Sequence, residues 1–341
     1  MTINVSGWAA FEPKGPLKKY NYELPSTPEE LGPFGVLLEV LSCSLCHSDL
    51  HMIDNDWDIT KYPIVPGHEI VGKIVCKGAK VALNVHDVVG VGWLASSCGS
   101  CDACTLGMEP QCPKAHPTIL NPHFGGISSH VFVEEKFAYN LNFEDPTRVA
   151  PLLCAGATVW TPLSMHLTPG LNVGVIGLGG LGASAIQLAD SLGHSVFCLT
   201  RGSAKKKDAL LLGADDAIDM TSDNEVVGIV NSLDLILNTS SAPLDYDKYM
   251  SCLAPGGKFI LLGLPGEESK ITIDSRSMVF KSTSISGSLI AGSRHMKELL
   301  RFAAINHIEP MVEMMQFSQI NEALSRLKEG NVRYRIVLTP D

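Results

Sequence analysis

The segment LNVGVIGLGGLG, residues 171–182, decides the fold. Val173–Ile176 predicts a short buried strand, and three glycines follow it at the spacing G-x-G-x-x-G. A glycine-rich turn between a strand and a helix lets backbone N–H groups approach the pyrophosphate of a dinucleotide. We therefore expect a dinucleotide-binding loop made by Gly177, Leu178, Gly179, Gly180, Leu181 and Gly182.

Strand-like and helix-like stretches alternate beyond this loop. We expect helices over Leu181–Leu192 and Lys205–Leu212, where apolar residues recur at helical spacing. We expect strands over Val196–Leu199, Leu233–Leu237 and Phe259–Leu262. This alternation predicts βαβ units and a doubly wound parallel sheet.

The two ends of the chain do not share this rhythm. Residues before about 148 are irregular and rich in short strands, such as Val36–Val40, Val88–Val91 and Ser129–Val133. After about residue 287 we expect two helices and a last strand, over 296–306, 319–329 and 334–338. The α/β chain is therefore predicted to hold a β-rich domain (1–147), an inserted dinucleotide-binding domain (148–286) and a return to the first domain (287–341).

Composition excludes several classes of protein. The 341 residues hold 26 Lys and Arg against 36 Asp and Glu, a net charge of −10, so we expect no nucleic-acid partner. A hydrophobic fraction of 45% excludes global disorder. Residues 149–189 carry no charge but hold seven glycines and three prolines, which indicates a buried core and no membrane span. The N-terminus lacks the pattern of a secretory signal, so we expect a cytoplasmic protein.

Four of the 10 cysteines form the cluster C-x2-C-x2-C-x7-C: Cys98, Cys101, Cys104 and Cys112. Four thiolates at such spacing close a tetrahedral shell around a structural Zn²⁺. Ferredoxin runs resemble the cluster, and Pro113 fits them, but their last gap is three residues and they come with further cysteines. The spacing favours zinc.

A second set of possible metal ligands is spread along the chain. Cys46 lies in LCHSDLH, His68 and Glu69 lie in PGHEIVG, and Cys154 lies in PLLCAGATVW. Each residue alone is weak evidence. Together, two Cys and one His form an open catalytic zinc set, the ligand pattern known from alcohol dehydrogenase. A fourth position then remains for a substrate oxygen.

The strand after the glycine loop predicts the coenzyme. An NAD site places Asp or Glu about 20 residues beyond the loop, but FCLTRGSAKKK has no carboxylate. Thr200, Arg201 and Lys205 can instead bind the 2′-phosphate of NADP(H). A solvated basic start of a helix is the alternative interpretation.

These motifs resemble those of the zinc-dependent medium-chain alcohol dehydrogenases, and of their cinnamyl alcohol dehydrogenase group in particular. The segment from Gly67 to Val81 matches the family's zinc signature, and LGADD and VRYRIVL follow in the expected order. The resemblance implies a GroES-like catalytic domain interrupted by a Rossmann domain, two zinc ions per chain, and cofactor contacts at Thr158 and Ser288. It also implies a homodimer joined through the sheet edge near 284–289.

The resemblance further implies hydride transfer between NADPH and a zinc-bound aldehyde, either aromatic (cinnamyl-type) or medium-chain aliphatic. Ser48 would then supply the proton and His51 would relay it to solvent, although His51 could also be an ordinary surface histidine. Glu69 would lie beside the zinc, and an ordinary salt-bridged glutamate is the alternative. Trp57 and Trp93–Leu94 are candidate walls of the substrate pocket, although each could equally be a packing residue. The segment after Cys112 is altered, and His86 replaces the glycine that the family usually has before Asp87.

Three other functions remain to be weighed. An NAD-dependent polyol dehydrogenase would carry Asp near Thr200, which is absent. A non-catalytic zinc Rossmann redox sensor would have lost zinc ligands, but Cys46, His68 and Cys154 are all present. A zinc-ribbon nucleic-acid binder conflicts with the net charge.

Overall fold

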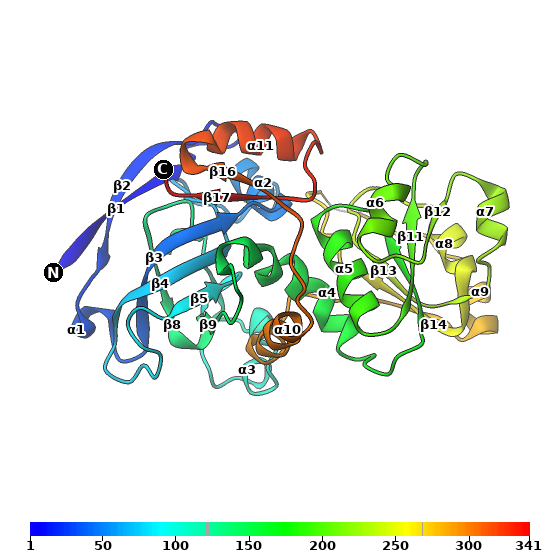
Figure 1. Cartoon of the computed structure of the whole chain (residues 1–341), viewed down its shortest axis with the longest axis horizontal. Helices are drawn as coiled ribbons and strands as arrows, with labels where there is room; N and C mark the ends of the chain where they lie inside the picture. Colours follow the sequence, from blue (N-terminus) through cyan, green and yellow to red (C-terminus); the bar gives the residue numbers. More distant parts are fainter. Residues whose placement is uncertain (121–122, 268) are drawn as a thin grey trace. The chain divides into compact units, whose positions relative to one another are not determined.

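The computed structural model describes residues 1–120, 123–267 and 269–341, and these fall into two compact units. Unit 1 comprises Met1–Ala157 and Ala291–Asp341, and unit 2 comprises Thr158–Ile290. One unit is thus inserted in the sequence of the other, as Figure 1 shows by its colours. The unit boundaries follow residues 157 and 290, later than the boundaries after residues 147 and 286 that the sequence predicts.

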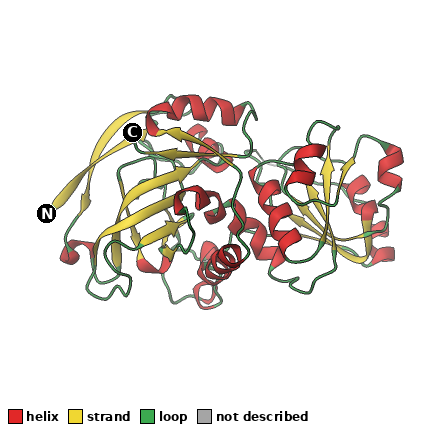
Figure 2. Cartoon of the chain, in the orientation of Figure 1, coloured by secondary structure: helices red, strands yellow, loops and turns green. Residues whose placement is uncertain are grey.

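Unit 2 is built on a six-stranded parallel sheet in the order β12-β11-β10-β13-β14-β15 (Figures 1 and 2). Counted from β10, this order is 3-2-1-4-5-6, the Rossmann arrangement. The strands are β10 (Asn172–Ile176), β11 (Ser195–Thr200), β12 (Asp216–Asp219), β13 (Leu233–Asn238), β14 (Leu253–Leu261) and β15 (Ser284–Gly287). The helices are α5 (Gly180–Ser191), α6 (Lys206–Leu211), α7 (Asp223–Val227), α8 (Tyr246–Cys252) and α9 (Ser275–Lys281), while α4 (Ala155–Leu163) crosses the boundary between the units.

The glycine loop between β10 and α5 meets three different steric demands. Gly177 has a φ of +87°, which an L side chain rarely adopts. A Cβ at Gly182 would lie 2.0 Å from the carbonyl oxygen of Gly177, so α5 can approach the turn only with glycine there. A Cβ at Gly179 would meet no atom within 4 Å, which leaves the backbone there open to a ligand. The three glycines therefore fit the roles of a dinucleotide-binding turn.

Unit 1 is built around a seven-stranded sheet in the order β16-β17-β3-β4-β5-β9, with β8 also paired to β3. Two smaller sheets pair β1 with β2 and β6 with β7. The strands are β1 (Thr2–Ala9), β2 (Lys18–Pro25), β3 (Gly35–Ser44), β4 (Glu69–Lys77), β5 (Val88–Val91), β6 (Leu94–Ser96), β7 (His116–Pro117), β8 (His130–Glu134), β9 (Tyr139–Asn140), β16 (Val312–Gln316) and β17 (Arg335–Thr339). The helices are α1 (Pro28–Leu31), α2 (His47–Asp54), α3 (Asp102–Thr105), α10 (Ser293–Ile305) and α11 (Ile320–Lys328), with 3-10 turns η1 (Glu109–Gln111), η2 (Glu135–Phe137), η3 (Pro146–Leu153) and η4 (Phe317–Gln319).

The C-terminal segment returns to unit 1 through the sheet. β17 pairs antiparallel with β3, where Val337 lies opposite Ser44 and Leu338 opposite Cys43. β17 thus comes beside the end of β3 that leads into Cys46 and α2. This pairing brings residues from the far end of the chain to the metal-binding residues.

The predicted elements match the structure closely. The predicted strand 88–91 coincides with β5, and the predicted helices over 181–192 and 319–329 match α5 and α11 within one residue at each end. β14 begins at Leu253, six residues before its predicted start at Phe259, because the turn residues Pro255 and Gly256 conceal the periodicity of its first part. No helix among the described residues is long and apolar enough to cross a membrane.

Candidate metal and catalytic site

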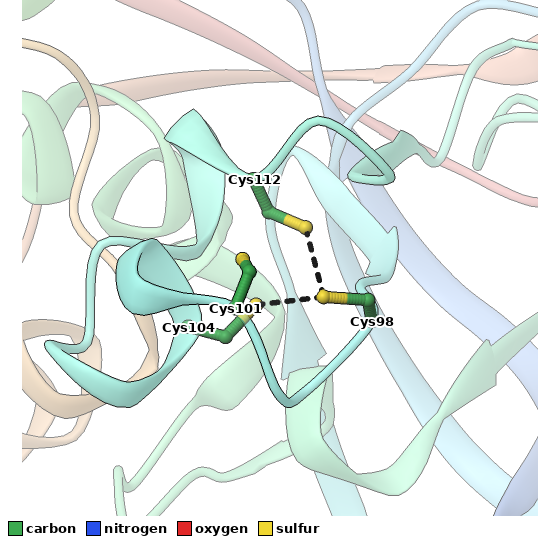
Figure 3. A group of neighbouring side chains, drawn as sticks. All are labelled: Cys98, Cys101, Cys104 and Cys112. Atoms are coloured by element: carbon green, nitrogen blue, oxygen red, sulfur yellow. Dashed lines mark hydrogen bonds between the residues drawn. The ribbon is translucent and has the colours of Figure 1, made fainter.

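The four clustered cysteines converge on one point of unit 1 (Figure 3). Their Sγ atoms all lie within 4.8 Å of one another. Cys98 Sγ lies 3.9 Å from Cys104 Sγ and 3.5 Å from Cys112 Sγ. Two sulfurs on one tetrahedral Zn²⁺ would be about 3.8 Å apart. The spacing of the thiols therefore fits a zinc ion without rearrangement of the backbone.

The backbone N–H groups of Ser100 and Cys101 lower the pKa of Cys98 to about 6. The thiolate is the metal-binding form of cysteine. The loop thus favours the charged ligand state of Cys98 before any metal is bound.

Glu109 fastens this cysteine lobe to the C-terminal part of unit 1. Its buried carboxylate accepts hydrogen bonds from Ser293 N at 3.0 Å and Ser293 Oγ at 2.6 Å, at the start of α10. Lys136 Nζ lies 2.9 Å from the same carboxylate. Glu109 thus accepts from a backbone N–H at the start of α10 that has no partner within the helix. Its carboxylate connects η1 of the cysteine lobe with η2 and α10.

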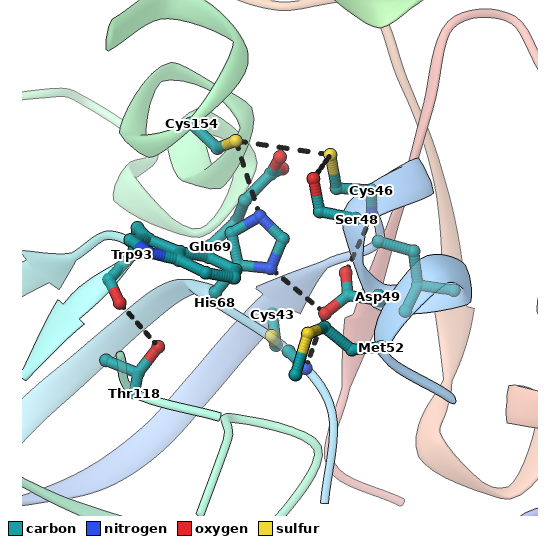
Figure 4. Close-up of polar contacts among 12 residues, drawn as sticks. Cys43, Cys46, Ser48, Asp49, Met52, His68, Glu69, Trp93, Thr118 and Cys154 are labelled. Atoms are coloured by element: carbon teal, nitrogen blue, oxygen red, sulfur yellow. Dashed lines mark hydrogen bonds and ion pairs between the residues drawn. The ribbon is translucent and has the colours of Figure 1, made fainter. Parts of the chain in front are cut away.

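The second group consists of Cys46, His68, Glu69 and Cys154, which are all buried in unit 1 (Figure 4). Cys46 lies between β3 and α2, His68 and Glu69 at the start of β4, and Cys154 between η3 and α4. Cys154 Sγ lies 4.0 Å from Cys46 Sγ and 3.3 Å from His68 Nε2. Tetrahedral zinc would require about 3.8 Å and about 3.6 Å. The spacing of the two thiols and the imidazole therefore fits a zinc ion, and Glu69 supplies a carboxylate within the same group.

Asp49 orients this group, although no sequence motif singles it out. Its buried carboxylate accepts hydrogen bonds from Cys46 N at 2.9 Å and Gly67 N at 2.8 Å, and lies 3.0 Å from His68 Nδ1. The Asp49 carboxylate accepts a hydrogen bond from Nδ1–H of His68. In the neutral ring, Nε2 therefore keeps its lone pair on the side of the two thiols. Burial opposes the charged form of His68, but Asp49 and Cys46 together outweigh it and raise the pKa of His68.

Glu69 and Arg335 place opposite charges beside the thiols. Both side chains are buried, and Arg335 Nη2 lies 3.5 Å from Glu69 Oε1. Neither carboxylate oxygen of Glu69 has a hydrogen-bond partner among the described residues. Burial raises the pKa of Glu69 to about 7, although Arg335 lowers it. A buried carboxylate without hydrogen bonds is a natural ligand or counterion for a metal ion.

The two expected proton-transfer residues lie on α2. Ser48 Oγ is 3.8 Å from Cys46 Sγ, so its hydroxyl borders the metal-binding group. His51 Nδ1 lies 2.7 Å from Asp56 Oδ2, and the His51 ring is tilted against Trp57 at a centroid distance of 5.1 Å. Asp56 could not be found from the sequence, because the loop after α2 carries no motif that pairs it with His51.

Trp93 contributes an aromatic wall to the metal-binding group. Its ring meets the His68 ring edge to face, with centroids 5.1 Å apart (Figure 4). Trp57 contacts His51 and Trp93 contacts His68, so each predicted pocket residue of this pair lies against one site histidine.

The expected coenzyme residues of unit 2 differ in their exposure. Arg201 is exposed at the end of β11, and Lys205 Nζ donates to the carbonyl of Leu178 in the glycine loop at 2.9 Å. Thr200 is buried, and its hydroxyl donates to the carbonyls of Gly202 at 2.9 Å and Ile218 at 3.2 Å. Thr200 would have to leave these bonds before it could donate to a phosphate.

The remaining two expected cofactor contacts occupy opposite ends of the sequence of unit 2. Thr158 is its first residue and is buried. Ser288 follows β15, where its N–H donates to Leu261 O at 3.0 Å.

Comparisons with known proteins agree with this architecture. Residues 32–142 match the alcohol dehydrogenase GroES-like domain, and residues 180–304 match the zinc-binding dehydrogenase domain. Cinnamyl alcohol dehydrogenase 8 of Arabidopsis thaliana is 36% identical over 97% of this chain and 94% of that protein. The aldehyde reductase YahK of Escherichia coli (strain K12) is 36% identical over 98% of each.

A solved structure gives the same result. The Helicobacter pylori CAD complexed with NADP(H) is 31% identical and superposes with a TM-score of 0.90 over 99% of each chain. Two domain matches, and relatives that are 36% identical over nearly the whole chain, agree with the two groups of candidate metal ligands. The chain therefore belongs to the zinc-binding medium-chain alcohol dehydrogenases, in their cinnamyl alcohol dehydrogenase-like group, and is an alcohol dehydrogenase or aldehyde reductase of that family.

Proposed function

We propose that this chain interconverts aldehydes and alcohols with NADP(H), using a catalytic zinc ion held by Cys46, His68 and Cys154. The observation that carries the proposal is the buried donor group beside the Ser48 hydroxyl. A zinc ion held there would act as a Lewis acid toward a carbonyl oxygen, while the nicotinamide would give or take the hydride. A second, structural zinc ion would be held by the four-cysteine group.

The chain's own residues supply the proton. Ser48 donates its hydroxyl proton to the oxygen of the aldehyde as it is reduced. His51 then passes a proton from solvent back toward Ser48. Asp56 accepts from Nδ1 of His51, so Nε2 is the nitrogen that first takes up a proton from solvent and then passes it on. Asp56 is therefore a positioning residue for His51.

The coenzyme preference rests on the end of β11. The exposed Arg201 and the nearby Lys205 place positive charge where an NAD-binding protein needs a carboxylate. The Helicobacter pylori relative was solved in complex with NADP(H), which supports the same preference. We place the main contacts to the 2′-phosphate at Arg201 and Lys205.

The substrates that we propose are aromatic or medium-chain aliphatic aldehydes. The rings of Trp57 and Trp93 lie against His51 and His68 and offer apolar surface beside the reacting groups. Relatives named cinnamyl alcohol dehydrogenase and aldehyde reductase support the same class.

We also propose a cytoplasmic homodimer. Among the described residues all ten cysteines are free of disulfides, in keeping with a reducing compartment. The strand β15 is an edge of its sheet, and the nearby side chains of Val279 and Phe280 are 78% and 81% exposed. An unpaired edge beside exposed apolar residues is suited to pairing with a second copy.

The activity is tested with a panel of aldehydes from cinnamaldehyde to short aliphatic ones, with NADPH and with NADH. We expect Ser48→Ala to abolish turnover while metal analysis still finds two zinc ions per chain. Near-normal turnover of Ser48→Ala would refute the relay. Ser26→Ala, which changes an exposed hydroxyl of unit 1 remote in sequence from α2, is the control.

The coenzyme assignment is tested by Arg201→Asp. We expect this variant to lose most of its preference for NADPH over NADH, measured as the ratio of kcat/KM values. Lys207→Asp makes the same charge change in the same exposed segment and should preserve the ratio. An unchanged ratio in Arg201→Asp would refute the assignment.

A further inference from the structure

Two histidines outside both cysteine groups lie close together in the segment that follows Cys112. His116 belongs to β7, and His123 precedes β8. Their ring centroids are 4.9 Å apart, and the ring planes meet at 60°. Neither residue takes part in the proposed reaction.

Backbone carbonyls hold both rings in the same tautomer. His116 Nδ1 lies 3.2 Å from Pro117 O, and His123 Nδ1 lies 3.2 Å from Phe132 O. A carbonyl oxygen can only accept, so each Nδ1 carries a proton, and in the neutral form of each ring Nε2 keeps its lone pair. Within the described parts of the chain no partner is recorded for either Nε2. Metal-binding imidazoles are commonly oriented by such a bond at their other nitrogen.

The separation of the rings suits a shared ion. The centre of an imidazole lies about 3.2 Å from a metal bound at its nitrogen, so two rings on one ion have centroids about 4.5 Å apart at 90° and about 5.2 Å apart at the tetrahedral angle. The observed 4.9 Å falls between these values.

The environment keeps His123 in its ligand form. Burial, and then the nearby His116, lower the pKa of His123 to about 4, so its ring is neutral at pH 7. The ring also stacks on Phe132, with centroids 5.8 Å apart and an interplanar angle of 9°. A neutral imidazole in a fixed orientation is ready to bind a metal without first losing a proton.

We propose that His116 and His123 form a metal site separate from both cysteine groups. Imidazole nitrogens favour Zn²⁺, Cu²⁺ and Ni²⁺ over Mg²⁺ and Ca²⁺. Among the described residues, groups of three or more His, Cys, Asp or Glu side chains close enough to share an ion are found at the two cysteine groups and not here. This site therefore offers two protein ligands, and water would fill the other positions of the ion. An ion on both rings would join β7 to the turn before β8.

The test is a calorimetric titration of the zinc-loaded, full-length enzyme with Ni²⁺. We expect one Ni²⁺ per chain in addition to the zinc, and His116→Asn or His123→Asn should weaken its binding by at least about tenfold. His307→Asn, which removes an exposed histidine of α10's C-terminal turn, should leave the affinity unchanged. The absence of an added Ni²⁺, or equal affinity in the variant with both substitutions, would overturn the proposal.

A second measurement needs no variant. One equivalent of Cu²⁺ on the zinc-loaded enzyme should give an electron paramagnetic resonance spectrum with coupling to two equatorial nitrogens. Coupling to one nitrogen, or to none, would also overturn the proposal. This result does not depend on whether either variant folds, or on whether the chain reduces aldehydes.

Discussion

Replacing Asp49 with asparagine tests whether this carboxylate positions the catalytic metal ligands. Asp49 accepts from Cys46 N, Gly67 N and His68 Nδ1 in a fully buried position. Asparagine has the same shape, but its one oxygen can serve only the two donors that now share Oδ1, and its NH₂ group would meet Cys46 N–H. A buried N–H left without an acceptor costs about 1–3 kcal/mol.

The effect on the metal follows from the same bonds. His68 would lose a charged partner at Nδ1, and the loss of such an outer partner weakens metal binding by about 10- to 100-fold. This factor corresponds to about 1.4–2.7 kcal/mol. The four-cysteine group contains no bond to Asp49, so we expect zinc to leave the catalytic group first.

The assay is zinc retention against a graded series of chelator concentrations, followed by metal analysis and turnover. At chelator concentrations at which the wild type keeps both zinc ions, Asp49→Asn should keep only one zinc ion per chain. The turnover of the variant should fall in parallel with this loss. Asp54→Asn is the matched control, since Asp54 lies on the same helix and its carboxylate forms an ion pair of 3.2 Å with the exposed Lys328. Wild-type zinc retention in Asp49→Asn would refute the reasoning.

Three further predictions concern stability in denaturant titrations. Glu109→Ala should cost about 2–3 kcal/mol because it removes the cap of α10 and the buried partner of Lys136, whereas Glu298→Ala should change stability by less than about 0.5 kcal/mol. His86 has a φ of +76°, so His86→Gly should stabilise the protein by up to about 1 kcal/mol, and a loss of stability would contradict a strained turn. The pKa of His123 is near 4 in the folded protein, below its value near 6.5 in the unfolded chain. The contribution of the neutral ring to the free energy of unfolding is therefore full above pH 6.5 and declines as the pH falls toward 4. Between pH 7 and 5.5 the free energy of unfolding of the wild type should fall by about 1 kcal/mol more than that of His123→Asn. Parallel plots of this free energy against pH would contradict the prediction.

Features that depend on short stretches of chain could be predicted from the sequence. The glycine loop is local, because Gly177 and Gly182 act within one turn between β10 and α5. The cysteine lobe is local as well, since Cys98 and Cys112 are only 14 positions apart in the sequence. Periodicity therefore predicted four strands of unit 2, β10, β11, β13 and β14, but not β12 or β15, and spacing predicted which cysteines converge.

Features that depend on tertiary contacts could not be predicted in this way. Asp49 reaches Gly67 and His68 only because β4 returns beside the end of β3. Arg335 reaches Leu45, where its Nη1 donates to the carbonyl at 3.1 Å, through the pairing of β17 with β3. Thr200 illustrates the opposite difficulty, because local backbone carbonyls occupy a hydroxyl that the sequence suggests is available to a ligand.

The charges of the catalytic group explain why its buried residues belong together. Two thiolates, Glu69 and Asp49 would carry four negative charges, against positive charges on Arg335 and on His68, whose pKa is raised, and all six side chains are buried. Burial raises the pKa of Glu69 to about 7, so its carboxyl group holds a proton more readily than an exposed one. A Zn²⁺ ion supplies two positive charges and can replace protons in the site, so metal binding and deprotonation are linked. The buried sulfur and oxygen atoms of this group cost free energy of folding when no cation balances them. The same atoms make the group suitable for binding zinc.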